Sequence, residues 1–371
     1  MTVKKVAILG RGTAGAIVAN KLLGLSCEIE WYYTSDKKPQ PVGEGTTSSF
    51  PEHLEHTYGM TFSEMEEAFD ATVKLGIHYE RWNNVDRFTH GFHAAVHGMH
   101  FNAGKFQDYA FNSALNLPNV TAIDKAVTED EIDCDYVFDC SGRPVSYEGY
   151  RKPKYIPVNS AFVTQCFWDT PQFYYTKTVA MKWGWVFMVP LQNRCSVGYL
   201  FNRDICSLDT VQEDVQRVFA WYGLNPSDVT NHIAFNNYVK EQIITKRTAY
   251  LGNSGFFLEP MEATTIDSIL QGANKGIQAM LAPQDASRMN REMQNFFVDV
   301  EQFIMLHYAV GGSEDSPFWD YAKERGDACL KDTEGKHPLN QDSKTYFCQK
   351  SYKQNIKGLR LDIPTEYIHV C

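Results

Sequence analysis

A glycine-rich segment near the start of the chain has the residue types and spacing that bind a dinucleotide. Residues 10–15 read Gly-Arg-Gly-Thr-Ala-Gly, after an apolar run and before a helical pattern. The first glycine permits a tight turn, the second lets backbone approach a pyrophosphate, and the third lets the helix pack on the strand. The alternative is a glycine turn with a purely structural role. The residues expected at the cofactor are Gly10, Gly12, Thr13, Ala14 and Gly15.

The acid that usually accompanies this segment is missing from its expected place. In dinucleotide folds, an Asp or Glu about 20 residues further on bonds the ribose hydroxyls. Here the second strand ends at Tyr33, and Asp36 comes slightly late. Ribose recognition therefore falls to Asp36, to the hydroxyls of Thr34 and Ser35, or to another group.

Two further segments carry residues suited to a cofactor. Gly43 and Glu44 lie in a loop whose glycines allow close approach to a ligand, although an ordinary loop has the same composition. Asp139 ends a buried strand and precedes Gly142, so its carboxylate is placed to bond a ribityl chain or a sugar. The alternative for Asp139 is an Asx turn at the end of the strand.

The elements that must position these residues begin with a parallel β-α-β unit. It comprises a strand over 3–9, a helix over 14–23 and a strand over 27–33. Periodicity then predicts a helix over 63–74, a strand over 91–97, a helix over 105–116 and a buried strand over 135–140. Residues 160–201 contain β-rich runs separated by Pro and Gly turns, which indicate a second, antiparallel sheet. The fold class is therefore α/β, with a parallel Rossmann-type sheet and an interleaved antiparallel and helical lobe.

Helical spacing returns over 208–222, 265–281, 286–307 and 318–330, and the last 40 residues are polar with weak periodicity, as in a loosely attached arm. Because no Ser/Gly linker separates the lobes, we expect them to be interleaved. The boundaries we assign are 1–59, 105–150 and 245–285 for the cofactor lobe, and 60–104, 151–244 and 286–371 for the substrate lobe.

Composition excludes several classes of function. The 371 residues carry 35 Lys and Arg against 45 Asp and Glu, a formal charge of -10, which is the wrong sign for nucleic acid. No apolar run approaches the roughly 20 residues that a bilayer requires. Nine cysteines without a Cys-x-x-Cys pair favour neither a metal site nor disulfides, and the opening residues do not resemble an export signal. We expect a cytoplasmic protein without a membrane or nucleic-acid partner.

The ordered motifs resemble those of glutathione-reductase-like flavoprotein monooxygenases, and further segments resemble the flavin-dependent tryptophan halogenase family. Residues 71–82 look like the segment with the family's active-site lysine. Residues 184–191 are similar to its Gly-Trp-x-Trp-x-Ile-Pro signature, and residues 252–266 to its Glu-Pro-Leu-Glu-Ser-Thr-Gly stretch. Residues 314–319 echo a late family element. The resemblance spans about residues 3–322 in family order.

The resemblance implies that Lys74 holds hypohalous acid, or its haloamine, against an aromatic ring. Without its flanking residues, Lys74 would be interpreted as a surface lysine at a helix end. The matching carboxylate, Glu262, would orient the halogenating species and take the proton from the ring. The alternative for this stretch is a capping box between Thr264 and Asp267.

The remaining matched residues receive roles by the same resemblance. Halide would bind the backbone at Thr264 and Thr265. The sequence differs from the usual family pattern at two positions, with Ala263 in place of Ser and Thr265 in place of Gly. Trp185 and Phe187 would separate substrate from flavin, although aromatics on a strand are also common in cores. Weaker matches are His90 and Phe92 as substrate contacts, His100 in a motif shared by wider flavoproteins, and Asn253 and Ile266 at the cofactor.

The function implied is halogenation of an electron-rich indole, phenol or aniline by a compact member of the family, of the sort some phage genomes encode. It would use O2, a halide ion and FADH2 from a separate flavin reductase. Many family members have over a hundred further residues that close over indole, so we expect a more open site. The alternatives are an aromatic hydroxylase of the same fold and a non-catalytic flavin-binding protein. A homo-oligomer is compatible with the sequence.

Overall fold

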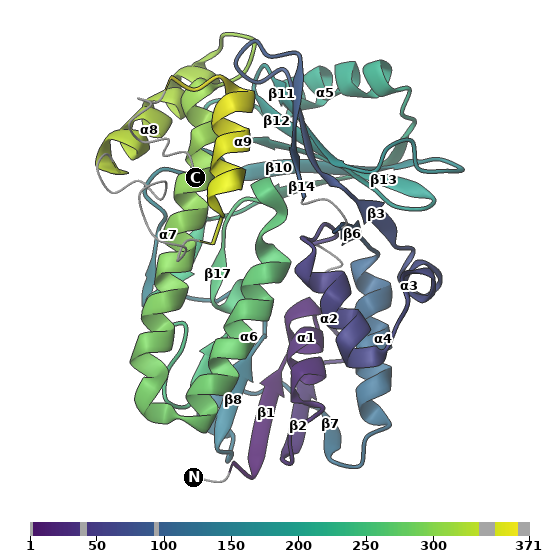
Figure 1. Cartoon of the computed structure of the whole chain (residues 1–371), viewed down its shortest axis with the longest axis vertical. Helices are drawn as coiled ribbons and strands as arrows, with labels where there is room; N and C mark the ends of the chain where they lie inside the picture. The colour runs from purple at the N-terminus through teal and green to yellow at the C-terminus, as the bar shows by residue number, and fades with distance from the viewer. Residues whose placement is uncertain (1–2, 38–42, 93–95, 334–345, 363–371) are drawn as a thin grey trace. The chain divides into compact units, whose positions relative to one another are not determined.

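The chain forms two compact units, each described here by itself (Figure 1). The structure, a computed structural model, describes residues 3–37, 43–92, 96–333 and 346–362. The first unit comprises residues 1–71, 101–152 and 238–295, and the second comprises 72–100, 153–237 and 296–371. The unit boundary falls within helix α7 (Ala286–Val310).

The first unit is built on a five-stranded parallel sheet with the order β16-β8-β1-β2-β7. The apolar run of β1 lies at its centre, with Val6, Ala7 and Ile8 fully buried. This confirms the predicted parallel β-α-β opening. The strands are β1 (Lys5–Leu9), β2 (Glu28–Tyr33), β7 (Val120–Asp124), β8 (Tyr136–Asp139) and β16 (Thr248–Tyr250).

Helices and a small antiparallel sheet complete the first unit. The helices are α1 (Thr13–Leu22), α2 (Ser49–Tyr58), α3 (Phe62–Phe69), α4 (Ala103–Leu115) and α6 (Thr265–Leu281). The small sheet contains β9 (Tyr150–Arg151), β15 (Tyr238–Lys240) and β17 (Phe256–Phe257). Short 3-10 turns are η1 (Glu129–Glu131), η2 (Gly252–Ser254), η3 (Met261–Ala263) and η4 (Pro283–Asp285).

The second unit contains a seven-stranded sheet with the order β14-β10-β13-β12-β11-β4-β5. Its strands pair antiparallel, as predicted for residues 160–201, except that β4 and β11 pair in parallel. The strands are β4 (Gly76–Glu80), β5 (Arg87–Gly91), β10 (Ser160–Phe167), β11 (Thr176–Met181), β12 (Gly184–Pro190), β13 (Arg194–Phe201) and β14 (Pro226–Ala234).

Helices pack on both faces of this sheet. Helix α5 (Leu208–Tyr222) covers the face that carries Val186 and Met188, and these side chains share one apolar core. On the other face, Trp185 contacts Tyr308 of α7 through a hydrogen bond. The remaining elements of the unit are β3 (Thr72–Lys74), β6 (Gly98–His100), α8 (Pro317–Thr333) and α9 (Gln349–Leu359).

Two predicted elements were wrong. The helix predicted over 63–74 ends at Phe69, because Asp70 adopts a left-handed conformation and residues 72–74 pair with β6. The expected loose arm contains α9, which buries Tyr352 and Leu359. The strand predicted over 91–97 includes residues 93–95, which lie outside the described residues, and β5 ends at Gly91.

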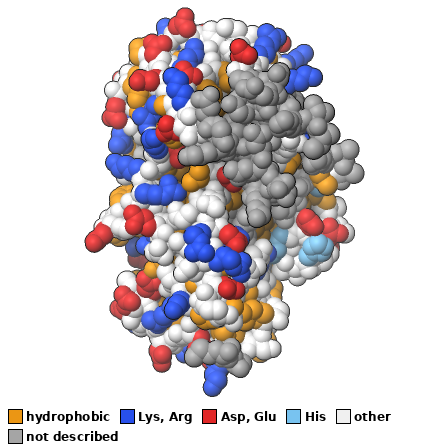
Figure 2. Space-filling model, turned by 60° about the vertical axis from the view of Figure 1, so that its left-hand side comes forward, with side chains coloured by type: hydrophobic (Ala, Val, Ile, Leu, Met, Phe, Trp, Pro, Cys, Tyr) orange, Lys and Arg blue, Asp and Glu red, His pale blue; other side chains and the backbone are white. Residues whose placement is uncertain are grey.

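Within the described ranges, no helix is long and apolar enough to cross a membrane. The face shown in Figure 2 mixes Lys and Arg with Asp and Glu side chains.

Candidate functional site

The glycine turn after β1 is shaped so that side chains are excluded from it. Gly10 has φ +95°, and a Cβ there would lie 2.4 Å from the carbonyl oxygen of Cys140. A Cβ at Gly15 would lie 2.0 Å from the carbonyl oxygen of Gly10. Only glycine fits at both positions, which keeps the turn and the start of α1 in contact with the sheet.

The N-terminus of α1 is suited to an anion. Its N-cap is Gly12, no side chain among the described residues caps the helix, and its first turn has no acid. The first amides of a helix lack intrahelical partners and carry partial positive charge, so they bind phosphate groups readily. A Cβ at Gly252 would lie 3.0 Å from the Cβ of Ala14, so the turn that carries Asn253 borders this helix start. These residues fit a dinucleotide diphosphate.

Asp139 closes β8 beside the glycine turn, where it pairs in register with Leu9. Its Oδ1 accepts hydrogen bonds from the amide of Ser141 at 2.9 Å and from the Ser141 hydroxyl at 2.6 Å. The predicted Asx turn is therefore present. Burial raises the pKa of the Asp139 carboxyl, and these hydrogen bonds oppose the shift. Both bonds use the same oxygen, so the turn is compatible with a bond from Oδ2 to a cofactor.

Asp267, in the first turn of helix α6, bonds the loop that follows residue 42. It does not form the predicted capping box. Asp267 accepts hydrogen bonds from the hydroxyls of Thr47, at 2.6 Å, and Ser49. In the part of the chain that is described, Thr264 makes no capping bond through its side chain. The predicted Thr264–Asp267 capping box was wrong because loop hydroxyls occupy the carboxylate. The first amides of α6, at the two threonines predicted to bind halide, therefore carry no side-chain cap in this region.

The carboxylate of Glu262 lies on a strained turn in front of α6. Glu262 and Ala263 both have positive φ, at 66° and 51°, and the Ala263 amide donates to the carbonyl of Pro260 at 3.0 Å. Each such non-glycine residue costs on the order of 1–3 kcal/mol, and residues of this kind cluster at functional sites. Glu262 is nearly fully buried. It belongs to the first unit and Lys74 to the second, so each is described within its own unit.

Lys74 is a buried residue on β3. Its side chain is 0% exposed, which contradicts the alternative of a surface lysine at a helix end. Pairing with Gly98 of β6 fixes the backbone. The ammonium nitrogen lies 5.8 Å from the centre of the Phe92 ring, a distance typical of a cation–π contact. The unit therefore holds a primary amine in a desolvated, aromatic environment.

His100 lies beside this amine and is held in one tautomer. Thr72 donates its hydroxyl proton to the carbonyl of Pro190 at 2.6 Å, so the same oxygen accepts from Nδ1 of His100 at 3.3 Å. Nε2 of His100 then accepts from the hydroxyl of Thr176 at 2.9 Å. Burial lowers the pKa of His100 well below its ordinary value, and the nearby Lys74 charge lowers it further. The imidazole is neutral, and it joins the lysine strand to the start of β11.

The aromatic residues of β12 form a rigid pair on one face of the sheet. Trp185 is fully buried and donates from Nε1 to the hydroxyl of Tyr308 at 2.8 Å. The ring of Phe187, 6.3 Å from that of Trp185, packs on Gly198, where a Cβ would lie 2.3 Å from the ring. Glycine at 198 is therefore required for the position of Phe187. His90 is half-buried on β5, with its ring 5.7 Å from Phe303.

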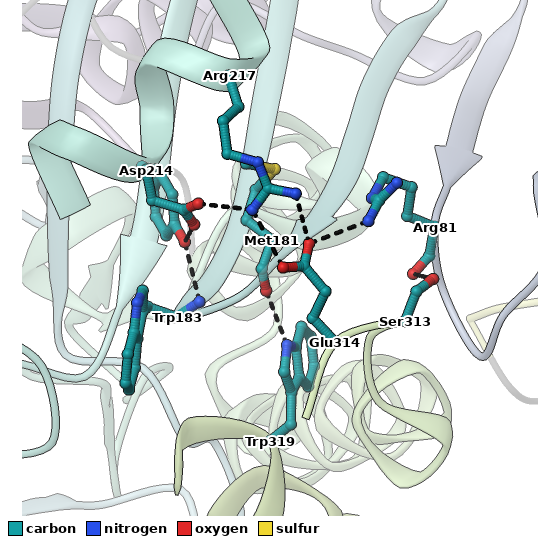
Figure 3. Close-up of polar contacts among 9 residues, drawn as sticks. Arg81, Met181, Trp183, Asp214, Arg217, Ser313, Glu314 and Trp319 are labelled. Carbon is teal, nitrogen blue, oxygen red and sulfur yellow. Dashed lines mark hydrogen bonds and ion pairs between the residues drawn. The ribbon is translucent and has the colours of Figure 1, made fainter. Parts of the chain in front are cut away.

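The late segment over 314–319 anchors the second unit (Figure 3). Glu314 accepts from Arg81 at 3.0 Å and from Arg217 at 2.8 Å, and hydrogen bonds from Arg217 lower the pKa of the Glu314 carboxyl. Trp319 donates from Nε1 to the carbonyl of Met181 at 2.7 Å. These contacts fix the start of α8 against the sheet.

Sequence reasoning missed the contacts of His100 and of Asp267. The partners of His100 come from two other strands, β3 and β11, and those of Asp267 lie about 220 residues earlier in the chain. Local spacing carries no signal for either set.

The fold and these residues define one α/β unit whose glycine turn fits a dinucleotide, and one sheet-and-helix unit that contains a buried amine. Comparison with known proteins then identifies the family. The family model described as tryptophan halogenase matches residues 5–118 and 116–364. The chain belongs to the tryptophan halogenase family.

Individual relatives are distant. Tryptophan 7-halogenase KtzQ of Kutzneria sp. (strain 744) is 24% identical over 270 residues, which cover 64% of this chain and 50% of that protein. Tryptophan 6-halogenase ThaL of Streptomyces albogriseolus is 23% identical over 351 residues, covering 80% of this chain and 64% of that protein. The chain thus spans half to under two thirds of the length of these relatives.

Solved structures show the same fold. Xcc4156, a flavin-dependent halogenase from Xanthomonas campestris, superposes with a TM-score of 0.82 at 20% identity, covering 97% of this chain and 89% of that one. The tryptophan halogenase from Shewanella frigidimarina NCIMB 400 gives 0.83 at 18% identity, covering 99% and 92%. The expected glutathione-reductase-like α/β fold with a second sheet-and-helix lobe is therefore confirmed.

Proposed function

We propose that this protein is a flavin-dependent halogenase of electron-rich aromatic compounds. The observation that carries the proposal is the fully buried amine of Lys74, which lies near the Phe92 ring and beside a neutral His100. A lysine is seldom fully buried without a specific role, because desolvation of its charged form is expensive. Family membership supplies the chemical context for that role.

The cofactor is FAD, held by the glycine turn and the free start of α1. The residues that contact it are Gly10, Gly12, Thr13, Ala14, Gly15, Gly43, Glu44, Asp139, Gly142, Asn253 and Ile266. Reduced FAD, when bound, would activate O2, and O2 would then accept two electrons from the flavin and two from the halide, giving hypohalous acid and water. A separate flavin reductase supplies the reduced cofactor. The cofactor lobe corresponds mainly to the first unit and the substrate lobe mainly to the second. Residues 60–71, 101–104, 151–152, 238–244 and 286–295, which we assigned to the substrate lobe, lie in the first unit.

The protein's own groups bind the halide, exclude the substrate and hold the product of halide oxidation. The first amides of α6, at Thr264 and Thr265, bind halide because their N–H groups lack side-chain caps in the described residues. The bulky pair Trp185 and Phe187 keeps aromatic substrate from the flavin. Hypohalous acid reaches the amine of Lys74, which positions the electrophilic halogen against the ring.

Glu262 completes the reaction as the base. Its carboxylate stabilises the positive charge that develops on the attacked ring, and then it takes the proton from the ring carbon. The turn with two left-handed residues holds this carboxylate in one orientation. His90 and Phe92 contact the substrate ring, which is of the indole, phenol or aniline type.

The test is turnover with enzymatically reduced FAD, O2, a halide and a panel of indoles, phenols and anilines, with products identified by mass spectrometry. Wild-type protein is expected to give halogenated arene, and Lys74→Met is expected to lose at least 100-fold of it while it still binds FAD. Lys246→Met, which replaces an exposed lysine, serves as the matched control. Hydroxylated product without halogen would favour the monooxygenase alternative, and FAD binding without turnover would favour a non-catalytic flavoprotein.

A further inference from the structure

The ribose end of the nucleotide site lacks the acid that usually ends the second strand of the sheet. The glycine turn abuts the end of β2, because the amide of Gly10 donates to the carbonyl of Tyr32 at 2.8 Å and Trp31 donates from Nε1 to the Gly10 carbonyl at 2.9 Å. In dinucleotide folds, the residue that ends this strand is the acid that bonds the ribose hydroxyls. Here that residue is Tyr33, whose ring packs edge-on against Phe111 of α4.

The nearby acids do not replace it. Asp124, which ends β7 and pairs with Tyr33, accepts from the amide of Ser35 at 3.0 Å. The Ser35 hydroxyl and amide together lower the pKa of the Asp124 carboxyl, so this acid is ionised and engaged by its neighbour. Asp36 is exposed in the turn that follows the strand. Lys37 and Lys125 each directly follow one of these two acids in the sequence.

A cation lies where the acid would be. The guanidinium of Arg11, from within the glycine turn, lies 4.7 Å from the centre of the Phe111 ring and 5.8 Å from that of Tyr33. Asp108 of α4 holds it through an ion pair of 2.8 Å to Nη2. Its Nε is buried and finds no acceptor among the described residues. The aromatic and acidic contacts from α4 thus fix this side chain beside the end of β2.

We propose that Arg11 recognises the adenosine ribose of the bound nucleotide, and that the site consequently accepts an adenosine carrying a 2′-phosphate. An arginine donates hydrogen bonds to hydroxyl oxygens as well as to phosphate, whereas a carboxylate in this position repels phosphate. An arginine near the ribose is the feature that accommodates a 2′-phosphate in dinucleotide folds. The inference rests on the proposed binding of FAD at the glycine turn.

The consequence is a second class of ligand for the same site. A 2′-phosphorylated dinucleotide, the chemical class of the phosphorylated nicotinamide cofactors, would compete with FAD for the glycine turn and Arg11. The protein would then release its flavin more readily where such nucleotides are abundant.

The experiment compares ADP-ribose with its 2′-phosphate, which differ only in the group that Arg11 would contact. Direct binding to full-length protein is measured by calorimetry, and displacement of FAD by flavin fluorescence. Wild-type protein is expected to bind the 2′-phosphate at least as tightly as ADP-ribose. Arg11→Met should weaken the 2′-phosphate about tenfold more than ADP-ribose, because a charge-assisted hydrogen bond is lost. Arg288→Met, which removes an exposed arginine elsewhere in the first unit, should leave the ratio unchanged.

Tyr33→Glu should shift the preference between ADP-ribose and its 2′-phosphate in the opposite direction. Restoring the strand-end acid should favour ADP-ribose over the 2′-phosphate by tenfold or more. The proposal is overturned if wild-type protein prefers ADP-ribose tenfold, binds neither adenylate, or keeps its ratio in Arg11→Met. Failure of FAD to bind wild-type protein would instead reject the cofactor of the proposed function, since the two adenylates are measured without flavin.

Discussion

At the scale of single residues, Lys74 and His100 are two buried ionisable groups that lie side by side, and the histidine is neutral. His100 is neutral because it is fully buried and because the ammonium is nearby. The ring is fixed by two threonine hydroxyls, so it orients the strand that carries the amine. The positions of both side chains therefore depend on the hydrogen bonds between the histidine ring and the two threonine hydroxyls.

The histidine predicts a pH dependence of stability. Because the folded-state pKa of His100 is depressed, the unfolded chain binds a proton first as pH falls below about 6.5, and stability is lost. His53, whose pKa burial lowers to about 4, acts in the same direction. We expect the melting temperature to fall from pH 7.5 to pH 5.5, and to fall less in His100→Gln. Equal slopes in the two proteins would contradict the depressed pKa of His100.

The same residue shows what sequence can and cannot provide at this scale. Lys74, Glu262 and Trp185 were predicted as site residues from their flanking residues. The strand pairing around Lys74 was not predicted, because a Thr-Val-Lys stretch after a helical pattern is also typical of a solvated helix end. The strand that carries Lys74 is held by pairing with β6, whose partner residues lie 24 to 28 positions later.

At the scale of elements, the well-predicted helices are those whose apolar spacing extends over several turns. Helices α5 and α6 begin and end at the predicted residues, because their apolar periodicity agrees with the tertiary contacts, and in α5 Ser207 also caps the N-terminus. The prediction of a helix over 63–74 was wrong from Asp70 onward. This single left-handed residue ends α3, and no Gly or Pro in the sequence indicates that end. The predicted capping box failed because spacing cannot reveal a competing partner from a distant loop.

The contact between that loop and α6 leads to a prediction for cofactor binding. Asp267→Ala removes the acceptor for Thr47 and Ser49, so the loop that carries Gly43 should lose its anchor. We expect FAD affinity to fall about fivefold to thirtyfold, which corresponds to one or two hydrogen bonds of about 1 kcal/mol each. Affinity is measured by flavin fluorescence, with Asp285→Ala as the exposed-acid control. Unaltered affinity in Asp267→Ala would show that the loop is held by other contacts.

At the scale of the whole molecule, the chain forms each unit from three separated segments, which explains why the sequence shows no linker. The interleaved organisation was predicted from that absence. The packing of the C-terminal residues was not predicted, because α9 has low hydropathy and only a few apolar side chains. Those few are buried, and Asn355 of α9 bonds His307 at 3.1 Å.

Helix α9 therefore contributes to the stability of the second unit. Leu359 is fully buried, so Leu359→Ala should destabilise that unit by about 2–5 kcal/mol. Lys357→Ala, on the exposed side of the same helix, should have little effect. The melting temperature of both variants is the measurement. If Leu359→Ala melts like the wild type, α9 is a dispensable arm.

The two successive residues with left-handed backbone before α6 influence which substitutions a mutational screen would recover. Ala263→Gly would relieve one strained backbone position, so it should raise the melting temperature. The same change would widen the range of orientations open to the neighbouring carboxylate and lower the rate of halogenation, as measured on the arene panel. We therefore expect a screen for heat tolerance to select Ala263→Gly early, and we expect a screen for turnover not to select it.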